Sequence, residues 1–203
     1  RERDGRTAVV TVGDVIGYAG GPESAALVQF LAAEGIPSVR GNHEDWLTAA
    51  GDMFCVVGEA PRRLPADAAA IVRKWPLDLR VQFADRAAIR LTHSLHDPDW
   101  AWVSEETVGS LLLRTAPDRI VMTGHSHRPA IWIVERQGRP QRLAFDYLTA
   151  EALEVAIRPD ARYVVDCGSL ARPELARERK DFAFGTYGVV DLLAGTLALR
   201  RIP

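Results

Sequence analysis

The stretch Thr7-Ala8-Val9-Val10-Thr11-Val12-Gly13-Asp14 holds a short β-branched run that stops at a glycine and a carboxylate. Such a run predicts a buried strand over 7–12. Apolar residues then recur at helical spacing until Gly35, which predicts a helix, and a second short strand at 36–40 runs into Gly41-Asn42. This order predicts parallel strands joined by a crossover. Polar residues follow each strand, at the edge where open α/β sheets place their sites.

The rest of the chain predicts the same class of fold. The middle, 46–76, is expected to be mostly helical, a hairpin is expected over 79–92, and a helix should run from a Ser104 cap to about residue 115. Beyond that helix the pattern is that of strands, expected at 120–123, 130–135, 142–145, 163–166, 187–192 and 196–200. We therefore expect an α/β fold in which two packed mixed sheets have helices outside, as one domain over 1–203.

Composition excludes several classes of protein. The 203 residues are 47% hydrophobic and 26% charged, as in an ordinary globular chain. The 25 basic and 27 acidic residues leave a net charge of −2, which disfavours a stable nucleic-acid partner. No apolar run approaches the roughly 18 residues that a membrane span needs. The two cysteines, Cys55 and Cys167, cannot build a disulfide framework, so we expect a cytoplasmic protein.

Histidines gather after the predicted strands. All five lie in three short polar clusters, which contain His43, then His93 and His96, then His125 and His127. Such grouping predicts a shared site, because scattered core or surface histidines would not cluster in this way. Imidazole and oxygen donors are the ligands favoured by Mn, Fe or Zn, whereas thiolate sites use cysteine. Two histidines separated by one residue suit a pair of ions that clamps a phosphoryl displacement.

Four motifs follow one another along the chain: Gly13-Asp14-Val15-Ile16-Gly17-Tyr18, Val39-Arg40-Gly41-Asn42-His43-Glu44, Leu91-Thr92-His93-Ser94 and Gly124-His125-Ser126-His127-Arg128-Pro129. In order and spacing they resemble the motifs of calcineurin-like metallophosphoesterases. A later stretch, Asp166-Cys167-Gly168-Ser169-Leu170, resembles the glycine-serine turn of their small bacterial branch, although the family often begins it with Asn-Pro. The resemblance covers nearly the whole chain and implies the family's four-layer αββα sandwich.

The resemblance also implies a set of metal ligands. Asp14 would bridge two divalent metal ions, Asn42, His93 and His125 would complete the shell of the second ion, and His127 would reach the first. Mn is the expected metal, with Fe or Zn as alternatives. The implied reaction is the hydrolysis of phosphomonoesters or phosphodiesters by a metal-bound hydroxide.

Two further residues receive roles. The resemblance places His43 beside the ions, where it would give a proton to the leaving group, and a histidine suits that task near pH 7. Arg40 is a candidate contact for a phosphate oxygen, with an ion pair to an acidic neighbour as the alternative. Trp100 and Trp102 are expected to pack and fix their loop; the alternative is a stacking platform for a nucleobase. The expected partner is a small phosphorylated substrate, nucleotides included.

One motif of the family is missing. Calcineurin-like metallophosphoesterases open with Asp-x-His on their first strand, which supplies two ligands to the first metal, and no such motif stands before Asp14. We expect that leading strand to lie upstream of Arg1. The alternative is a catalytically inactive scaffold or interaction protein with the same fold, which the missing motif favours and the retained ligands oppose.

Overall fold

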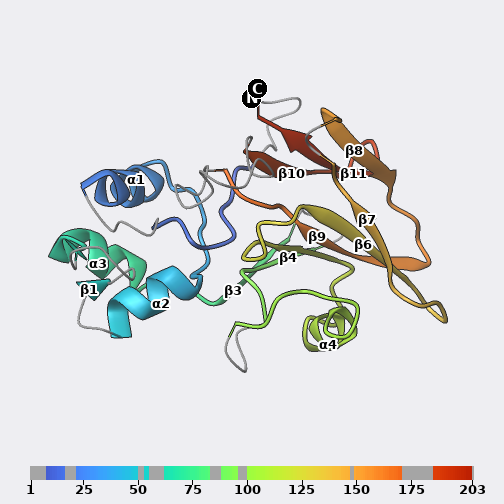
Figure 1. Cartoon of the computed structure of the whole chain (residues 1–203), viewed down its shortest axis with the longest axis horizontal. Helices are drawn as coiled ribbons and strands as arrows, with labels where there is room; N and C mark the ends of the chain where they lie inside the picture. The colour runs from blue at the N-terminus through green and yellow to red at the C-terminus, as the bar shows by residue number, and fades with distance from the viewer. Residues whose placement is uncertain are drawn as a thin grey trace. The chain divides into compact units, whose positions relative to one another are not determined.

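The structure of the chain is a computed structural model, which describes residues 8–16, 22–49, 53–54, 62–82, 88–95, 100–146, 149–170 and 185–202 (Figure 1). The chain forms two compact units, Arg1–Leu79 and Arg80–Pro203. The expectation that a single domain spans both units stays a prediction.

The first unit is mainly helical. It holds α1 (Pro22–Ala33), α2 (Asn42–Ala49) and α3 (Ala66–Val72), together with an antiparallel pair of two-residue strands, β1 (Met53–Phe54) and β2 (Arg62–Arg63). α1 and α3 share a core whose fully or nearly fully buried members are Ile16, Ala25, Val28, Leu64, Ala68, Ala69 and Val72. Ile16 belongs to this core, so the segment that carries Asp14 is anchored two residues beyond it.

In place of the two strands predicted at 7–12 and 36–40, the described residues form one isolated parallel bridge between Thr11 and Ser38. The Thr11 N–H donates to the Pro37 carbonyl at 3.0 Å, and the Val39 N–H donates to the Thr11 carbonyl at 3.4 Å. The parallel direction is therefore as expected, but no ladder forms among the described residues. Pro37 has no N–H to donate, and Gly13, with φ of 89°, turns the chain away directly after the bridge.

The second unit is built on a six-stranded sheet of order β3-β4-β5-β9-β6-β7 (Figure 1). Its strands are β3 (Asp78–Val81), β4 (Ile89–Thr92), β5 (Ile120–Thr123), β6 (Ala130–Glu135), β7 (Gln141–Ala144) and β9 (Ala161–Asp166). β4, β5 and β9 are parallel, whereas β6 and β7 run antiparallel. Because Thr123 pairs with Asp166 in this register, the carboxyl ends of the parallel strands meet at one edge.

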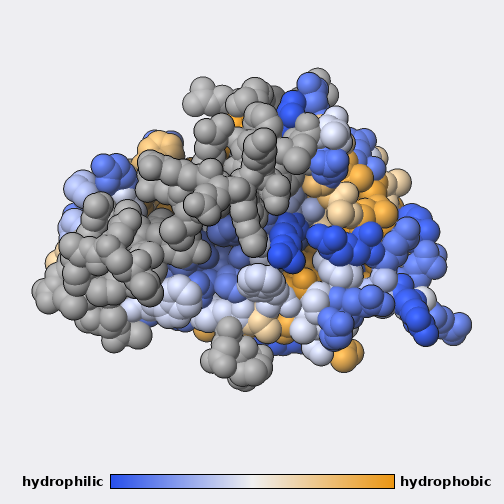
Figure 2. All heavy atoms as spheres, viewed as in Figure 1, coloured by the Kyte–Doolittle hydropathy of each residue, from blue (hydrophilic) through white to orange (hydrophobic). Residues whose placement is uncertain are grey.

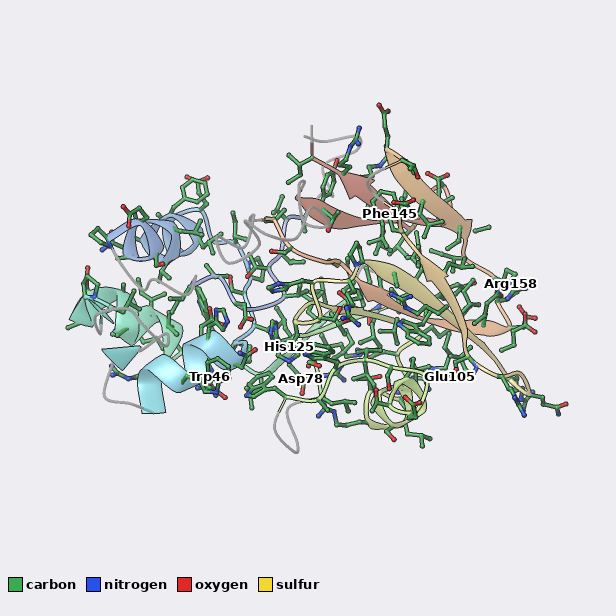
Figure 3. The ribbon with its side chains drawn as sticks, viewed as in Figure 1. Trp46, Asp78, Glu105, His125, Phe145 and Arg158 are labelled. Atoms are coloured by element: carbon green, nitrogen blue, oxygen red, sulfur yellow. The ribbon has the colours of Figure 1, made fainter. Side chains whose placement is uncertain are left out.

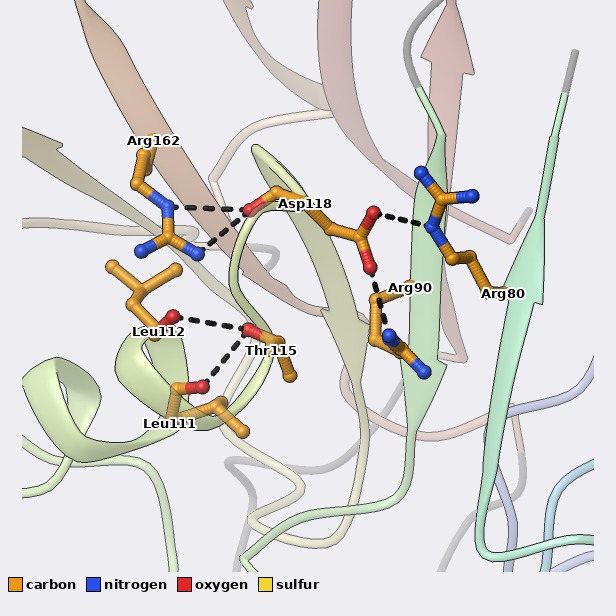
Figure 4. Close-up of polar contacts among 7 residues, drawn as sticks. All are labelled: Arg80, Arg90, Leu111, Leu112, Thr115, Asp118 and Arg162. Atoms are coloured by element: carbon orange, nitrogen blue, oxygen red, sulfur yellow. Dashed lines mark hydrogen bonds and ion pairs between the residues drawn. The ribbon is translucent and has the colours of Figure 1, made fainter.

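A buried carboxylate ties the opposite ends of these strands together (Figure 4). Asp118 precedes β5, and its side chain is fully buried between the Arg80 Nε at 2.7 Å and the Arg90 Nε at 3.0 Å. Its carbonyl accepts a hydrogen bond from the Arg162 Nη2 at 2.7 Å. These bonds link β3, β4, β5 and β9 at the edge away from the histidines.

A second, three-stranded sheet of order β10-β11-β8 packs on one face of the first. Its strands are β8 (Ala152–Ala156), β10 (Thr186–Asp191) and β11 (Thr196–Arg201). A Cβ added at Gly188 of β10 would lie 2.8 Å from the Met122 Cε and 2.9 Å from the Cys167 Sγ, so the two sheets are in tight contact there. Hydrophobic residues gather where β8 and β11 lie in the space-filling view (Figure 2).

Helix α4 (Val108–Arg114) covers the other face of the large sheet. Its residues Val108, Leu111 and Leu112 share a buried cluster with Val121 of β5 and Val164 of β9. Alternate residues of the same strands thus face the helix on one side and the second sheet on the other. This helix–sheet–sheet arrangement confirms the α/β fold with two packed sheets.

Three details differ from the expectations. The second sheet is wholly antiparallel, not mixed. The helix expected to begin after a Ser104 cap begins at Val108, because the Ser104 hydroxyl donates to the Glu106 Oε2 at 2.5 Å and does not cap a backbone N–H; residues 105–107 form a turn. β8 is an additional strand, in which the exposed Glu154 alternates with the half-buried Leu153 and Val155.

Candidate metal centre

The backbone is strained at the predicted ligands. Among the described residues, four that are not glycine have positive φ: Asp14 at 53°, Trp100 at 55°, His125 at 71° and His127 at 54°. This left-handed conformation costs an L-residue roughly 1–2 kcal/mol, and it concentrates at functional sites. Three of the four are residues for which the sequence predicts metal binding.

In the first unit, Asp14 is fixed to the start of α2. Its Oδ1 accepts the N–H of His43, the second residue of the helix, at 3.0 Å. Asp14 thereby caps α2 from outside the helix, because it accepts one of the first N–H groups, which have no partner within the helix. The contact requires glycine at position 41, because an added Cβ there would lie 2.6 Å from the Asp14 backbone nitrogen.

Glu44 holds the same two segments together. Its carboxylate is fully buried and accepts three backbone N–H groups, from Asp14 at 2.9 Å, Ile16 at 2.9 Å and Gly41 at 2.6 Å. The bond to Gly41 is the glutamate half of a capping box, because Glu44 is the third residue of α2. No role for Glu44 was predicted from the sequence, although its position three residues after Gly41 is the capping-box signal that could have identified one.

His43 is buried and has a defined tautomer. Its Nδ1 lies 2.8 Å from the Ile16 carbonyl oxygen, and a carbonyl only accepts, so Nδ1 carries hydrogen. Nε2 lies 3.6 Å from the Asp14 Oδ2. The Trp46 ring is 5.6 Å away between centroids. Asn42, the neighbouring predicted ligand, is 2% exposed at the first position of α2.

Arg40 forms an ion pair with an acidic neighbour, which was the alternative to a phosphate contact. Its Nη1 lies 3.3 Å from the Asp45 Oδ1, and both side chains are partly exposed. Its Nε is buried without a hydrogen-bond partner among the described residues. The ion pair does not test the expected contact with a phosphate oxygen, which stays a prediction.

In the second unit, the sheet brings two predicted ligands together. His93 follows β4, and His125, labelled in Figure 3, follows β5; their ring centroids are 5.0 Å apart with planes at 64°. The Gly124 N–H donates to the His93 carbonyl at 3.0 Å, which links the two loops. His127 follows in the second loop and is half-buried.

Asp166, at the end of β9, supports the loop that carries His125 and His127. Its Oδ2 accepts the Ser126 hydroxyl at 2.5 Å, and its Oδ1 accepts the Gly168 N–H at 3.1 Å. Burial raises the pKa of Asp166 from 3.8 to about 6, against the opposing effect of the Ser126 hydrogen bond. This chain has Asp166-Cys167 where the family often has Asn-Pro, and Asp166, like an asparagine, has a side chain that accepts hydrogen bonds.

The donor chemistry of both units fits a borderline or hard divalent cation. The candidate donors are a carboxylate, an amide oxygen and imidazoles, the set typical of Mn, Fe or Zn sites. A thiolate is not available from Cys167, because burial raises the pKa of its thiol to about 12. Cys55 and His96 lie outside the described residues.

Two tryptophans stand beside the histidines. Trp100 contacts His93 edge-on at 5.6 Å between centroids, as expected for packing. Trp102 lies 6.3 Å from His125, and the Arg128 guanidinium is 5.3 Å above its ring. The Trp102 side chain nevertheless stays 51% exposed.

Comparisons with known proteins place the fold. No protein-family model and no curated protein sequence matches the chain. Among solved structures, the chain is similar to a metallophosphoesterase from Sphaerobacter thermophilus, with a TM-score of 0.64 and 16% identity over 98% of this chain and 79% of that one. The chain therefore has the calcineurin-like metallophosphoesterase fold. None of the helices in its described part is both long and apolar enough for a transmembrane segment.

Proposed function

We propose that this chain is a metal-dependent phosphoesterase that hydrolyses phosphomonoesters or phosphodiesters. Asp14, His93 and His125 would be among its metal ligands. The observation that carries the proposal is the strained backbone at Asp14, His125 and His127, in a chain with the metallophosphoesterase fold. A fold retains such strain where a side chain must be aimed precisely.

We further propose that Asn42 and His127 complete the donor set for two divalent ions, with Mn expected and Fe or Zn as alternatives. When bound, such ions neutralise charge on a phosphate and lower the pKa of a water molecule. Asp14 is suited to its role because the α2 N-terminus holds its Oδ1 and Glu44 holds its backbone.

His43 would act on the leaving group. The Ile16 carbonyl keeps hydrogen on Nδ1 and fixes the ring, so Nε2 is the nitrogen that exchanges a proton. We propose that the protonated Nε2 gives this proton to the oxygen of the departing alcohol. Its burial, at 4% exposure, limits competition from bulk water.

The experiment is an assay of aryl phosphate mono- and diesters with added Mn²⁺, before and after chelation. Hydrolysis should be lost on chelation and restored by Mn²⁺. The variant His43→Ala should keep its bound metal and turn over slowly. Activity that ignores chelation contradicts the proposal, and loss of metal from His43→Ala contradicts the role given to His43.

A further inference from the structure

We infer that Trp102 and Arg128 form a recognition platform for phosphoesters whose esterified group is aromatic. The inference rests on the proposed function, because it names a substrate class for the same centre. The shared chemistry is a phosphate joined to a flat aromatic group, which an aryl phosphate or a nucleoside phosphate could supply.

The first argument is an exposed ring on a fixed loop. Fully burying a large apolar side chain is worth roughly 1.5–3 kcal/mol, yet Trp102 is 51% exposed while Trp132 in the same unit is 5% exposed. The Trp102 carbonyl accepts the Thr107 hydroxyl at 2.8 Å, and a bridge pairs the neighbouring Ala101 with Leu95. The ring is therefore held at the surface by a pinned backbone.

The second argument is position. The Trp102 ring centroid lies 6.3 Å from that of His125, with the planes at 72°, and His125 in turn lies beside His93. A phosphate bound next to these imidazoles would hold its esterified group within reach of the indole. Aromatic groups stack on tryptophan whatever their substituents, because every base or aryl ring has a π-face.

The third argument is an uncompensated positive charge. The Arg128 side chain is exposed, and no carboxylate in the described part of the chain pairs with it. Its N–H donates to the Ser126 hydroxyl at 2.9 Å, so its backbone belongs to the loop that carries His125. A guanidinium over an indole orients the ring by a cation–π contact, and its charge attracts an anionic substrate.

A second Arg–Trp pair in the same unit provides a matched control. Arg142 lies over the Trp132 ring at 5.8 Å, but Trp132 is buried under α4 and offers no open face. Substituting Arg142 therefore removes the same kind of contact without touching the exposed platform.

The test compares kcat/KM for phenyl phosphate, adenosine 5′-monophosphate and glycerol phosphate in the Mn²⁺-loaded full chain. Base stacking on an aromatic side chain corresponds to a factor of roughly 5 to 150. In Trp102→Ala, the ratio of kcat/KM for an aromatic substrate to that for glycerol phosphate should fall by that factor. Trp102→Phe should keep most of the ratio. Arg128→Gln should lower it, whereas the matched change Arg142→Gln should leave it unchanged.

A fall for only one aromatic substrate supports the platform and identifies which group it takes. An unchanged ratio, or an equal loss for all three substrates, overturns it. If none of the three is hydrolysed, the proposed function fails separately, and equilibrium dialysis then decides the platform. Adenosine 5′-monophosphate should bind wild-type protein at least fivefold more tightly than Trp102→Ala, and equal binding overturns the inference.

Discussion

Replacing Glu44 by glutamine tests how Asp14 and His43 are held. The carboxylate accepts three N–H groups, two on Oε2 and one on Oε1. An amide has one oxygen, so at best it keeps the bonds from Asp14 and Gly41 and turns its NH₂ toward the Ile16 N–H. Losing one charge-assisted bond costs about 1.5–3 kcal/mol, and leaving a buried donor unpaired costs about 1–3 kcal/mol more.

We therefore expect Glu44→Gln to lower the free energy of unfolding by about 3 kcal/mol or more. The assay is urea denaturation followed by circular dichroism at pH 7. Glu34→Gln is the matched control, because Glu34 is exposed after α1 and the same change there should stay within about 0.5 kcal/mol. A Glu44→Gln stability equal to that of Glu34→Gln would refute the idea that this carboxylate clamps the two segments.

Three further predictions concern the second unit. The pKa of Asp166 is raised from 3.8 to about 6, so the folded state loses about 3 kcal/mol of stability as pH rises from 4 to above 6 and this carboxyl ionises. In urea titrations, Asp166→Asn should therefore become more stable relative to wild type over that pH range. A stability difference that does not change with pH would contradict this. The free energy of unfolding of His127→Gly should exceed that of His127→Ala by about 1 kcal/mol, because glycine adopts the positive φ of position 127 without strain. A more stable His127→Ala would contradict the idea that this backbone is strained. Asp118→Asn should destabilise by about 1–3 kcal/mol in the same assay, because the fully buried side chain loses its charge-assisted bonds while the partly exposed Arg80 and Arg90 guanidinium groups regain water, and a loss below about 0.5 kcal/mol would contradict that account.

The parts of the site that the sequence predicted follow from local rules. His93 comes directly after a buried strand and His125 follows the next parallel strand after one glycine. Parallel strands bring such positions to one edge, where the structure places the two rings 5.0 Å apart. The fold class was predictable for the same reason, because strand runs and glycine turns are local signals. β8 escaped prediction, because its alternation is only five residues long, with Glu154 exposed between the half-buried Leu153 and Val155.

What the sequence did not predict depends on distant partners. Ser126 and Asp166 are 40 residues apart, and no local pattern indicates that the Ser126 hydroxyl will donate a hydrogen bond to the Asp166 carboxylate. The exposure of Trp102 was likewise hidden, because a tryptophan beside a polar loop favours packing over a stacking platform. Glu44 is the intermediate case, since its capping position was visible but its bonds to Asp14 and Ile16 were not.

The most direct test of the central claim is equilibrium binding of Mn²⁺ to the purified full chain, measured with wild type, Asp14→Asn, His93→Ala and His43→Ala. Wild type and His43→Ala should bind Mn²⁺ alike, whereas Asp14→Asn and His93→Ala should each bind at least tenfold more weakly. No binding by wild type, or equal binding by all four proteins, would contradict the claim that these side chains hold a divalent cation.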